Sequence, residues 1–342
     1  MKTTKPIIVV GGYGAVGRHI VADLHRMLPN ARIVVAGRSR EKAQSFADTF
    51  DGRVSAESVD LTSESATEAT LPRCSLVILN TEAGAELAVL TCIKYAIPLI
   101  TVAASVSIMR AIADMHADAR SAGVALVTEV GLAPGLMNLM ARQVMADLPD
   151  AQFVDLVLQL AMVGDHGPEA MQWTIARSKE AGRAIALEPA LPAIGRWVIP
   201  VDFVDREKVA SDLGVDTVSS SLALMPAWSS RVLPVIAPFL AKHPRLLEKI
   251  EGPLDTISRI VGLPVGNLNL VVRARSENDA VTMRLSGKNQ SRVTGLLAAK
   301  TAERFVSRGQ KVPTGVVGMA DIVTFDDLRS AVEDIGCAII MT

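Results

Sequence analysis

The sequence predicts an α/β protein whose first part is a doubly wound parallel sheet and whose second part is an α+β domain with a mixed antiparallel sheet. Up to about residue 130, short apolar runs alternate with helical patterns, which is typical of strands buried between two layers of helices. Later segments alternate apolar and polar residues instead, as half-buried antiparallel strands do. The 342 residues suffice for two domains of ordinary size.

A glycine-rich turn follows the first apolar run, which ends at Val10, and a helical pattern begins directly after the turn. The spacing Gly12-x-Gly14-x-x-Gly17 is the dinucleotide fingerprint of the Rossmann fold. We expect Gly12 to allow the sharp turn, Gly14 to admit a pyrophosphate close to the backbone, and Gly17 to let the helix pack on the sheet. The positive end of the helix attracts such a pyrophosphate. The cofactor-binding residues predicted in this turn are Gly11, Gly12, Tyr13, Gly14, Ala15, Val16 and Gly17.

Five further apolar runs are expected as strands of the same sheet, each followed by a turn. They are continuous rather than alternating, which indicates a parallel sheet covered on both faces. Together they define a Rossmann domain over about residues 1–130. The expected strands cover residues 31–37, 54–59, 75–79, 99–102 and 124–128.

The second part of the chain has a different pattern. Residues 153–162 alternate in part, and residues 268–275 and 280–287 alternate more cleanly around a polar turn, which predicts a hairpin. A strongly periodic stretch, 291–307, predicts a helix, and residues 326–335 predict a short acidic one.

Composition narrows the class of protein. A net charge of −1 offers no basic excess for nucleic-acid binding, and 49% apolar residues support a large core. The cysteines, Cys74, Cys92 and Cys337, are scattered among apolar residues, so we expect reduced core thiols in a cytoplasmic protein and no metal site. We expect no signal peptide, because the first apolar run is short and leads directly into the glycine turn. Residues 222–240 contain three prolines and predict a buried or interface helix, with contact to a membrane surface as a minor alternative.

The end of the second strand predicts which dinucleotide binds. An NAD-binding domain usually carries an acidic residue there, which holds the ribose hydroxyls. This sequence has Arg38 and Ser39 at that place and no carboxylate. Arginine pairs well with a phosphate, so we expect NADP(H) rather than NAD(H), with Arg38 and Ser39 binding the 2′-phosphate. The alternative is that Arg38 belongs to a solvated helix start.

Three later loops lie at the same edge of the predicted sheet. Asp60 and Leu61 follow the third strand, where adenine is often contacted, although Asp60 is equally expected to cap its own turn. Asn80 and Thr81 follow the fourth strand and Ala103 follows the fifth. Because ligands bind beyond the carboxyl ends of parallel strands, we expect all five residues in the cofactor site.

Several segments resemble those of saccharopine dehydrogenase-like oxidoreductases. The loop with Pro134 and Gly135 is the most telling, because the glycine fingerprint occurs in many superfamilies. The resemblance rests on residues 11–17, 36–39, 59–62, 131–138 and 294–296.

The resemblance implies an architecture and an activity. It implies a Rossmann domain over residues 1–130, a substrate and dimerisation domain over 131–290, and a chain end, 291–342, that returns to the first domain. It implies a homodimer that reduces an imine or oxidises an amine in an amino-acid-like small molecule. Related oxidoreductases differ in substrate, so the substrate does not follow.

Two residues are candidates for proton transfer. Glu129 follows the sixth strand, beside the expected nicotinamide, and its alternative role is an ion pair that supports the loop. His166 lies in a glycine-rich loop after a strand of the second domain, and its alternative is a surface histidine. An amino-acid substrate also needs a cation for its carboxylate. The candidates are Arg177, Arg183, Arg196, Arg273, Arg275 and Arg284.

Three functions are therefore open. The leading one is an NADP(H)-dependent oxidoreductase that acts at a C–N bond. The second is an NADPH-dependent reductase of a C=C bond in a lipid-like substrate, which residues 222–240 favour because they are apolar. The third is an NADP-binding sensor without turnover.

Overall fold

The computed structural model describes residues 5–102, 105–164, 168–191, 194–203, 206–243, 260–261, 263–309 and 312–342. The chain forms two compact units. The first comprises Met1–Leu136 and Thr294–Leu328, and the second comprises Met137–Val293 and Arg329–Thr342.

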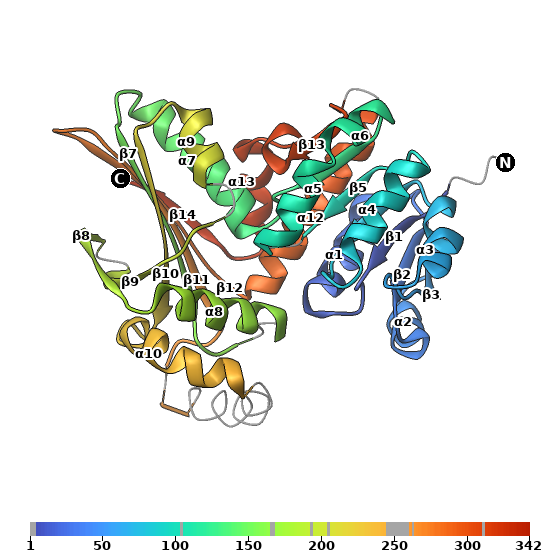
Figure 1. Ribbon diagram of the computed structural model, residues 1–342, viewed down its shortest axis with the longest axis horizontal. Coiled ribbons are helices and arrows are strands. Elements are labelled where there is room, and N and C mark those ends of the chain that lie inside the picture. The colour runs from blue at the N-terminus through green and yellow to red at the C-terminus, as the bar shows by residue number, and fades with distance from the viewer. Residues whose placement is uncertain are drawn as a thin grey trace. The chain divides into compact units, whose positions relative to one another are not determined.

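The first unit contains a seven-stranded sheet in which every strand is parallel to its neighbours. Its strand order is β13-β6-β5-β4-β1-β2-β3, so the chain reverses direction across the sheet next to β1 (Figure 1). This order confirms the doubly wound fold. The strands are β1 (Ile7–Val10), β2 (Ile33–Gly37), β3 (Val54–Ser58), β4 (Leu76–Leu79), β5 (Leu99–Thr101), β6 (Ala125–Thr128) and β13 (Gly315–Gly318).

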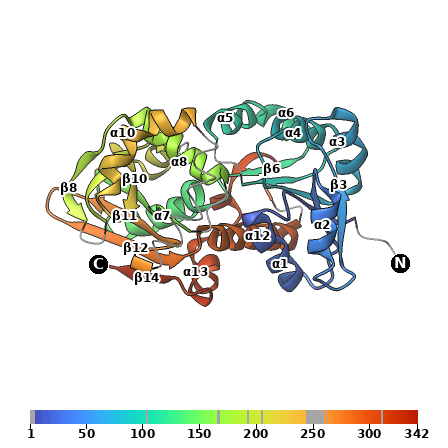
Figure 2. The same cartoon turned by 90° about the horizontal axis from the view of Figure 1, so that it is seen from below.

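Helices cover both faces of this sheet. Ile8 and Val10 of β1 pack in one apolar cluster with Val89 and Ile112, so α4 and α5 cover that face. Ile7 and Val9 are equally buried and face the opposite side, because strand side chains alternate. Figure 2 shows α4, α5 and α6 on one side of the sheet and α1 and α12 on the other. The helices are α1 (Ala15–Met27), α2 (Arg40–Ala47), α3 (Glu64–Thr70), α4 (Ala85–Lys94), α5 (Val106–Asp114), α6 (His116–Ser121) and α12 (Gln290–Arg308).

The end of the chain contributes to both units. β13 pairs with β6, as a return to the first domain requires. β14 (Ala338–Met341) instead pairs with β12 (Ala280–Lys288) of the second sheet. The residues expected to return, 291–342, are therefore divided, and 329–342 lie in the second unit after α13 (Phe325–Asp334) begins. The unit boundary also falls after Leu136 rather than at residue 130.

The second unit is built on a mixed seven-stranded sheet of order β14-β12-β11-β7-β10-β9-β8 (Figure 1). The expected hairpin is formed by β11 and β12, and β7 pairs antiparallel with β11 but parallel with β10. The other strands are β7 (Phe153–Ala161), β8 (Ile185–Leu191), β9 (Gly195–Pro200), β10 (Thr217–Met225) and β11 (Asn267–Arg275). Its helices include α7 (Met137–Asp147), α8 (Pro168–Ala181), α9 (Arg206–Leu213) and α10 (Ser229–Lys242).

Two expectations about elements are corrected. The residue pattern between the fifth and sixth strands predicts a single helix over residues 106–122, which the structure divides into α5 and α6 at Met115. Residues 222–240 are not one helix, because residues 222–225 are the end of β10 and α10 begins only at Ser229. In the described part of the chain, no helix has the length and apolarity that a membrane crossing needs. The three cysteines are buried, unbonded thiols, as the sequence predicts.

Candidate functional site

The glycine turn after β1 is held in shape by close backbone contacts. Gly11 has a left-handed φ of 76°, and a Cβ added there would lie 2.4 Å from the carbonyl oxygen of Asn80. A Cβ at Gly17 would lie 2.1 Å from the carbonyl oxygen of Gly11. Gly17 therefore allows close packing of the helix, as expected. The left-handed residue of the turn is Gly11, and Gly12 is needed because a Cβ there would lie 2.7 Å from the carbonyl oxygen of Val9.

The N-terminus of α1 points its backbone groups toward this turn. Gly14 is the N-cap, its N–H donates to the carbonyl of Gly11 at 3.0 Å, and no side chain caps the helix. No acidic residue occurs in the first turn. The first N–H groups of a helix lack partners inside the helix and can bind an anion. At this helix no nearby carboxylate of the first turn would repel one. Ala15 is exposed and Val16 is half-buried, which leaves this helix end accessible.

Asn80 braces the turn from β4. Its Nδ2 donates to the carbonyl of Gly11 at 3.3 Å, and its backbone N–H donates to the carbonyl of Val10 at 3.0 Å. Thr81 beside it is half-buried. The structure thus brings the residues after β4 against the glycine turn, as the strand order predicts. The role of Asn80 in this geometry is to position the loop.

The end of β2 lies on the other side of β1. Arg38 is exposed, and Ser39 caps α2 by accepting a hydrogen bond on Oγ from the N–H of Lys42 at 3.2 Å. The hydroxyl of Tyr13, from the glycine turn, accepts a hydrogen bond from the N–H of Ser39 at 3.1 Å. The sequence offered no sign of this second contact, because Tyr13 and Ser39 are 26 residues apart.

Asp60 closes the turn after β3. Its Oδ1 accepts hydrogen bonds from the hydroxyl of Thr62 at 2.7 Å and from the N–H of Thr62 at 3.0 Å. These hydrogen bonds, together with the positive charge of Arg38, lower the pKa of the Asp60 carboxyl below its usual value. The Asp60 side chain therefore caps its own turn, which is one of the two roles expected for it. Leu61 beside it is buried.

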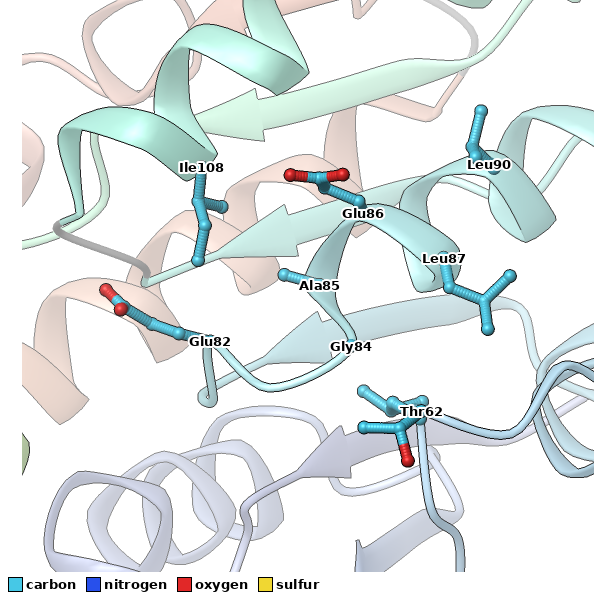
Figure 3. A pocket seen from close by; sticks show the side chains of 9 residues that line it. Thr62, Glu82, Gly84, Ala85, Glu86, Leu87, Leu90 and Ile108 are labelled. Atoms are coloured by element: carbon cyan, nitrogen blue, oxygen red, sulfur yellow. The ribbon is translucent and has the colours of Figure 1, made fainter.

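An open pocket of about 450 Å³ lies between the turn after β3 and the start of α4. In Figure 3 the side chains of Thr62, from that turn, and Leu87, from α4, border the same hollow. Glu82 lines it too, and its Oε1 accepts a hydrogen bond from the N–H of Ser105 at 2.9 Å. Glu82 and Gly84 lie in the same loop as Asn80 and Thr81. Their position after the fourth strand is therefore the sequence feature from which they could have been predicted. The pocket is lined by Leu61, Thr62, Glu82, Gly84, Ala85, Glu86, Leu87, Leu90 and Ile108.

The loop after β6 folds back on itself. Glu129 is half-buried and has a left-handed φ of 59°. A Cβ at Gly135 would lie 2.4 Å from the carbonyl oxygen of Glu129, so the two ends of the loop touch. Two other predicted site residues, Ala103 and His166, lie outside the described residues.

Two candidate arginines for a substrate carboxylate already have a partner. Arg273 and Arg275 of β11 lie on one face of the sheet, as strand alternation predicts, and both donate to Oδ2 of Asp155 on β7. Arg273 is 4% exposed, so it serves the core of the second unit. Among the others, Arg177 pairs with Glu180 and Arg196 pairs with Glu188. Arg183 is exposed and Arg284 is half-buried.

The N-terminal unit matches a known family model. The match covers residues 7–127 and is described as the saccharopine dehydrogenase NADP binding domain. These residues, about a third of the chain, are therefore similar to the NADP-binding domains of saccharopine dehydrogenases. NADP is therefore the cofactor, as the end of β2 predicts, and the residues fit it: an exposed arginine stands where NAD-binding domains place a carboxylate. Among the described residues, no group of His, Cys, Asp or Glu side chains is arranged to hold a metal ion.

The saccharopine dehydrogenase-like fold extends over both units. Apo saccharopine dehydrogenase (L-Glu forming) from Saccharomyces cerevisiae matches with a TM-score of 0.68 at 12% identity, covering 99% of this chain and 100% of that chain. DAP dehydrogenase from C. glutamicum in complex with DAP matches with a TM-score of 0.49 at 12% identity, covering 96% of this chain and 99% of that chain. Comparison with curated protein sequences gave no match. The first likeness shows a fold shared with an oxidoreductase.

Proposed function

We propose that this protein is an NADP(H)-dependent oxidoreductase that acts at a C–N bond of an amino-acid-like substrate. The observation that carries the proposal is the likeness to saccharopine dehydrogenase over 99% of the chain, because it includes the second unit and not only the widespread Rossmann domain. Fold alone does not fix a reaction, so the residues of the site carry the rest of the argument.

The cofactor would be held at three points of the first sheet. The N–H groups at the start of α1, beside Gly14, bind the pyrophosphate. Arg38 and the hydroxyl of Ser39 bind the 2′-phosphate, because Ser39 Oγ accepts from the N–H of Lys42 and keeps its own proton to donate. The pocket between the turn after β3 and α4 receives the adenine, with Leu61 as its apolar floor.

The bound nicotinamide supplies or accepts a hydride, and the protein has to position the substrate and move one proton. We propose Glu129 and His166 as the candidate proton carriers. Glu129 follows β6, at the carboxyl edge of the sheet where ligands of such folds bind. Its left-handed backbone, an uncommon conformation for glutamate, fixes where the side chain leaves the loop.

A turnover assay tests the reaction class. NADPH oxidation is followed with a panel of keto acids mixed with amines, and NADP reduction is followed with amino acids. Consumption of NADPH only when keto acid and amine are both present supports the proposal. Consumption with enoyl substrates instead would favour the C=C alternative, and tight binding without turnover on any panel would favour a sensor.

Two variants test the proton carriers once a substrate is known. Glu129→Gln or His166→Asn is expected to lower kcat by about 10²- to 10⁴-fold and to remove one limb of the pH profile, with NADPH affinity unchanged. Glu277→Gln, an exposed glutamate in the hairpin turn, serves as the matched control. If both site variants keep the wild-type pH profile, neither residue carries the proton.

The proposal also concerns the oligomeric state of the protein and its cellular compartment. We propose a homodimer formed through the second unit, in a cytoplasmic and reducing environment suited to three unbonded thiols. Light scattering at micromolar concentration tests the assembly, and a mass of 36.3 kDa, that of one chain, would contradict it.

A further inference from the structure

The ring of Tyr13 lies against the last residue of β2. A Cβ added at Gly37 would come within 2.7 Å of Tyr13 Cε1 and 2.8 Å of its hydroxyl oxygen. Only glycine therefore leaves the ring room at this place. The same hydroxyl accepts the hydrogen bond from the N–H of Ser39. One side chain of the glycine turn thus touches the residues on both sides of Arg38.

Tyr13 is also held through its backbone carbonyl. Arg18 Nε donates to the carbonyl oxygen of Tyr13 at 2.9 Å, and the Arg18 guanidinium lies over the ring of Phe46, 4.9 Å from its centre. Phe46 belongs to α2, the helix that Ser39 caps. The contacts Arg18–Tyr13, Tyr13–Ser39 and Arg18–Phe46 therefore join the start of α1 to both ends of α2.

These contacts restrain the segment that meets the 2′-phosphate. The N–H of Ser39 is satisfied by Tyr13, so the peptide between Arg38 and Ser39 cannot rotate without leaving that donor unpaired. The phenol oxygen accepts this bond and keeps its own proton, which remains available to a phosphate oxygen. The 2′-hydroxyl of NAD(H) carries no charge, so it gains less than a 2′-phosphate from an Arg38 held in this position.

We propose that Tyr13 is a positioning residue that sets the preference for NADP(H) over NAD(H), by holding Arg38 and Ser39 in place for the 2′-phosphate. The inference rests on the proposed role of Arg38 and Ser39. It assigns to Tyr13 a role in discriminating between the cofactors, besides its place in the pyrophosphate turn.

Fluorescence titration with NADPH and with NADH tests the inference on the full-length chain. Tyr13→Phe keeps the ring and removes only the hydroxyl. It is expected to weaken NADPH binding about three- to tenfold, the effect of one lost hydrogen bond, and to change NADH binding less than about twofold. Gly37→Ala keeps Tyr13 but displaces its ring. It is also expected to weaken NADPH binding more than NADH binding. Tyr95→Phe, at the end of α4, is the matched control, because the chain has two tyrosines.

The outcomes separate this inference from the assignment of Arg38. If Arg38→Ala abolishes the preference and Tyr13→Phe keeps the wild-type ratio of the two dissociation constants, Tyr13 has no positioning role. Equal weakening of NADPH and NADH by Tyr13→Phe also overturns the inference, because the hydroxyl would then serve the turn as a whole. If Arg38→Ala leaves the preference intact, the assignment of Arg38 fails instead.

Discussion

Asp155 and Arg273 form a buried ion pair at the centre of the second sheet, with 2.8 Å between Oδ2 and Nη2 and both side chains 5% exposed. Arg275 donates to the same carboxylate oxygen, and Ser219 donates to the other oxygen at 2.7 Å. Arg273 also donates to the carbonyl of Pro189 on β8. A buried charge is costly unless it is paired and hydrogen-bonded, so we expect this cluster of Asp155, Arg273, Arg275 and Ser219 to be required for the stability of the second unit.

Removing the shared carboxylate is expected to destabilise the protein. Asp155→Ala leaves Arg273 buried without its counter-ion, and we expect a loss of about 3–5 kcal/mol in the free energy of unfolding, measured by urea denaturation. The matched control is Asp212→Ala, which removes a surface pair with Arg142 at 3.5 Å and is expected to cost at most about 1 kcal/mol. Equal losses for the two variants would mean that the buried group does not stabilise the sheet.

The returning helix α12 packs closely on α1, and Gly295 makes this possible. A Cβ at Gly295 would lie 2.5 Å from His19 Cβ and 3.1 Å from the carbonyl oxygen of Val16. We expect Gly295→Ala to destabilise the protein, because overpacking of about 1–3 kcal/mol exceeds the gain of about 1 kcal/mol in helix propensity. Thermal unfolding measures it against Gly52→Ala, whose Cβ meets open space. An unchanged or raised Tm for Gly295→Ala would contradict this packing.

The thiols are expected to be unreactive in the folded protein. Burial raises the pKa of Cys74 to about 11 and also raises the pKa of Cys92 and Cys337. A thiol reagent at pH 8 should therefore modify none of the three in the native chain within minutes, and all three in urea. Because the unfolded thiols ionise near pH 8.5 and the folded ones do not, they lower stability as the pH rises above about 9. Rapid native labelling would show that a cysteine is accessible.

The strand pattern and the glycine fingerprint predicted most of the first sheet, because β1, β2, β4 and β6 are buried apolar runs with a turn after each, although the edge strand β3 is partly polar. The end of the chain was harder. β13 and β14 are short and similar in composition, and only pairing with β6 or β12 decides to which unit each belongs.

Within the site, sequence position placed Arg38, Asp60 and Asn80 at one edge of the sheet but not their contacts. The hydrogen bonds from Thr62 to Asp60 and from Ser39 to Tyr13 depend on how loops fold across the sheet edge. Likewise, alternation put Arg273 and Arg275 on one face, yet their partner Asp155 lies on a strand 118 residues earlier than Arg273. Long-range pairing of this kind is not readable from one sequence.

The most direct measurement of the central claim is the ratio of NADH to NADPH dissociation constants for the wild type and for Arg38→Asp. The account predicts that the wild type binds NADPH more tightly, and that Arg38→Asp weakens NADPH about ten- to a hundredfold, since one charge-assisted contact is replaced by repulsion. Arg32→Asp, at the opposite end of β2, should leave the ratio unchanged. Equal weak binding of both nucleotides by the wild type, or a preserved NADPH preference in Arg38→Asp, would contradict the account.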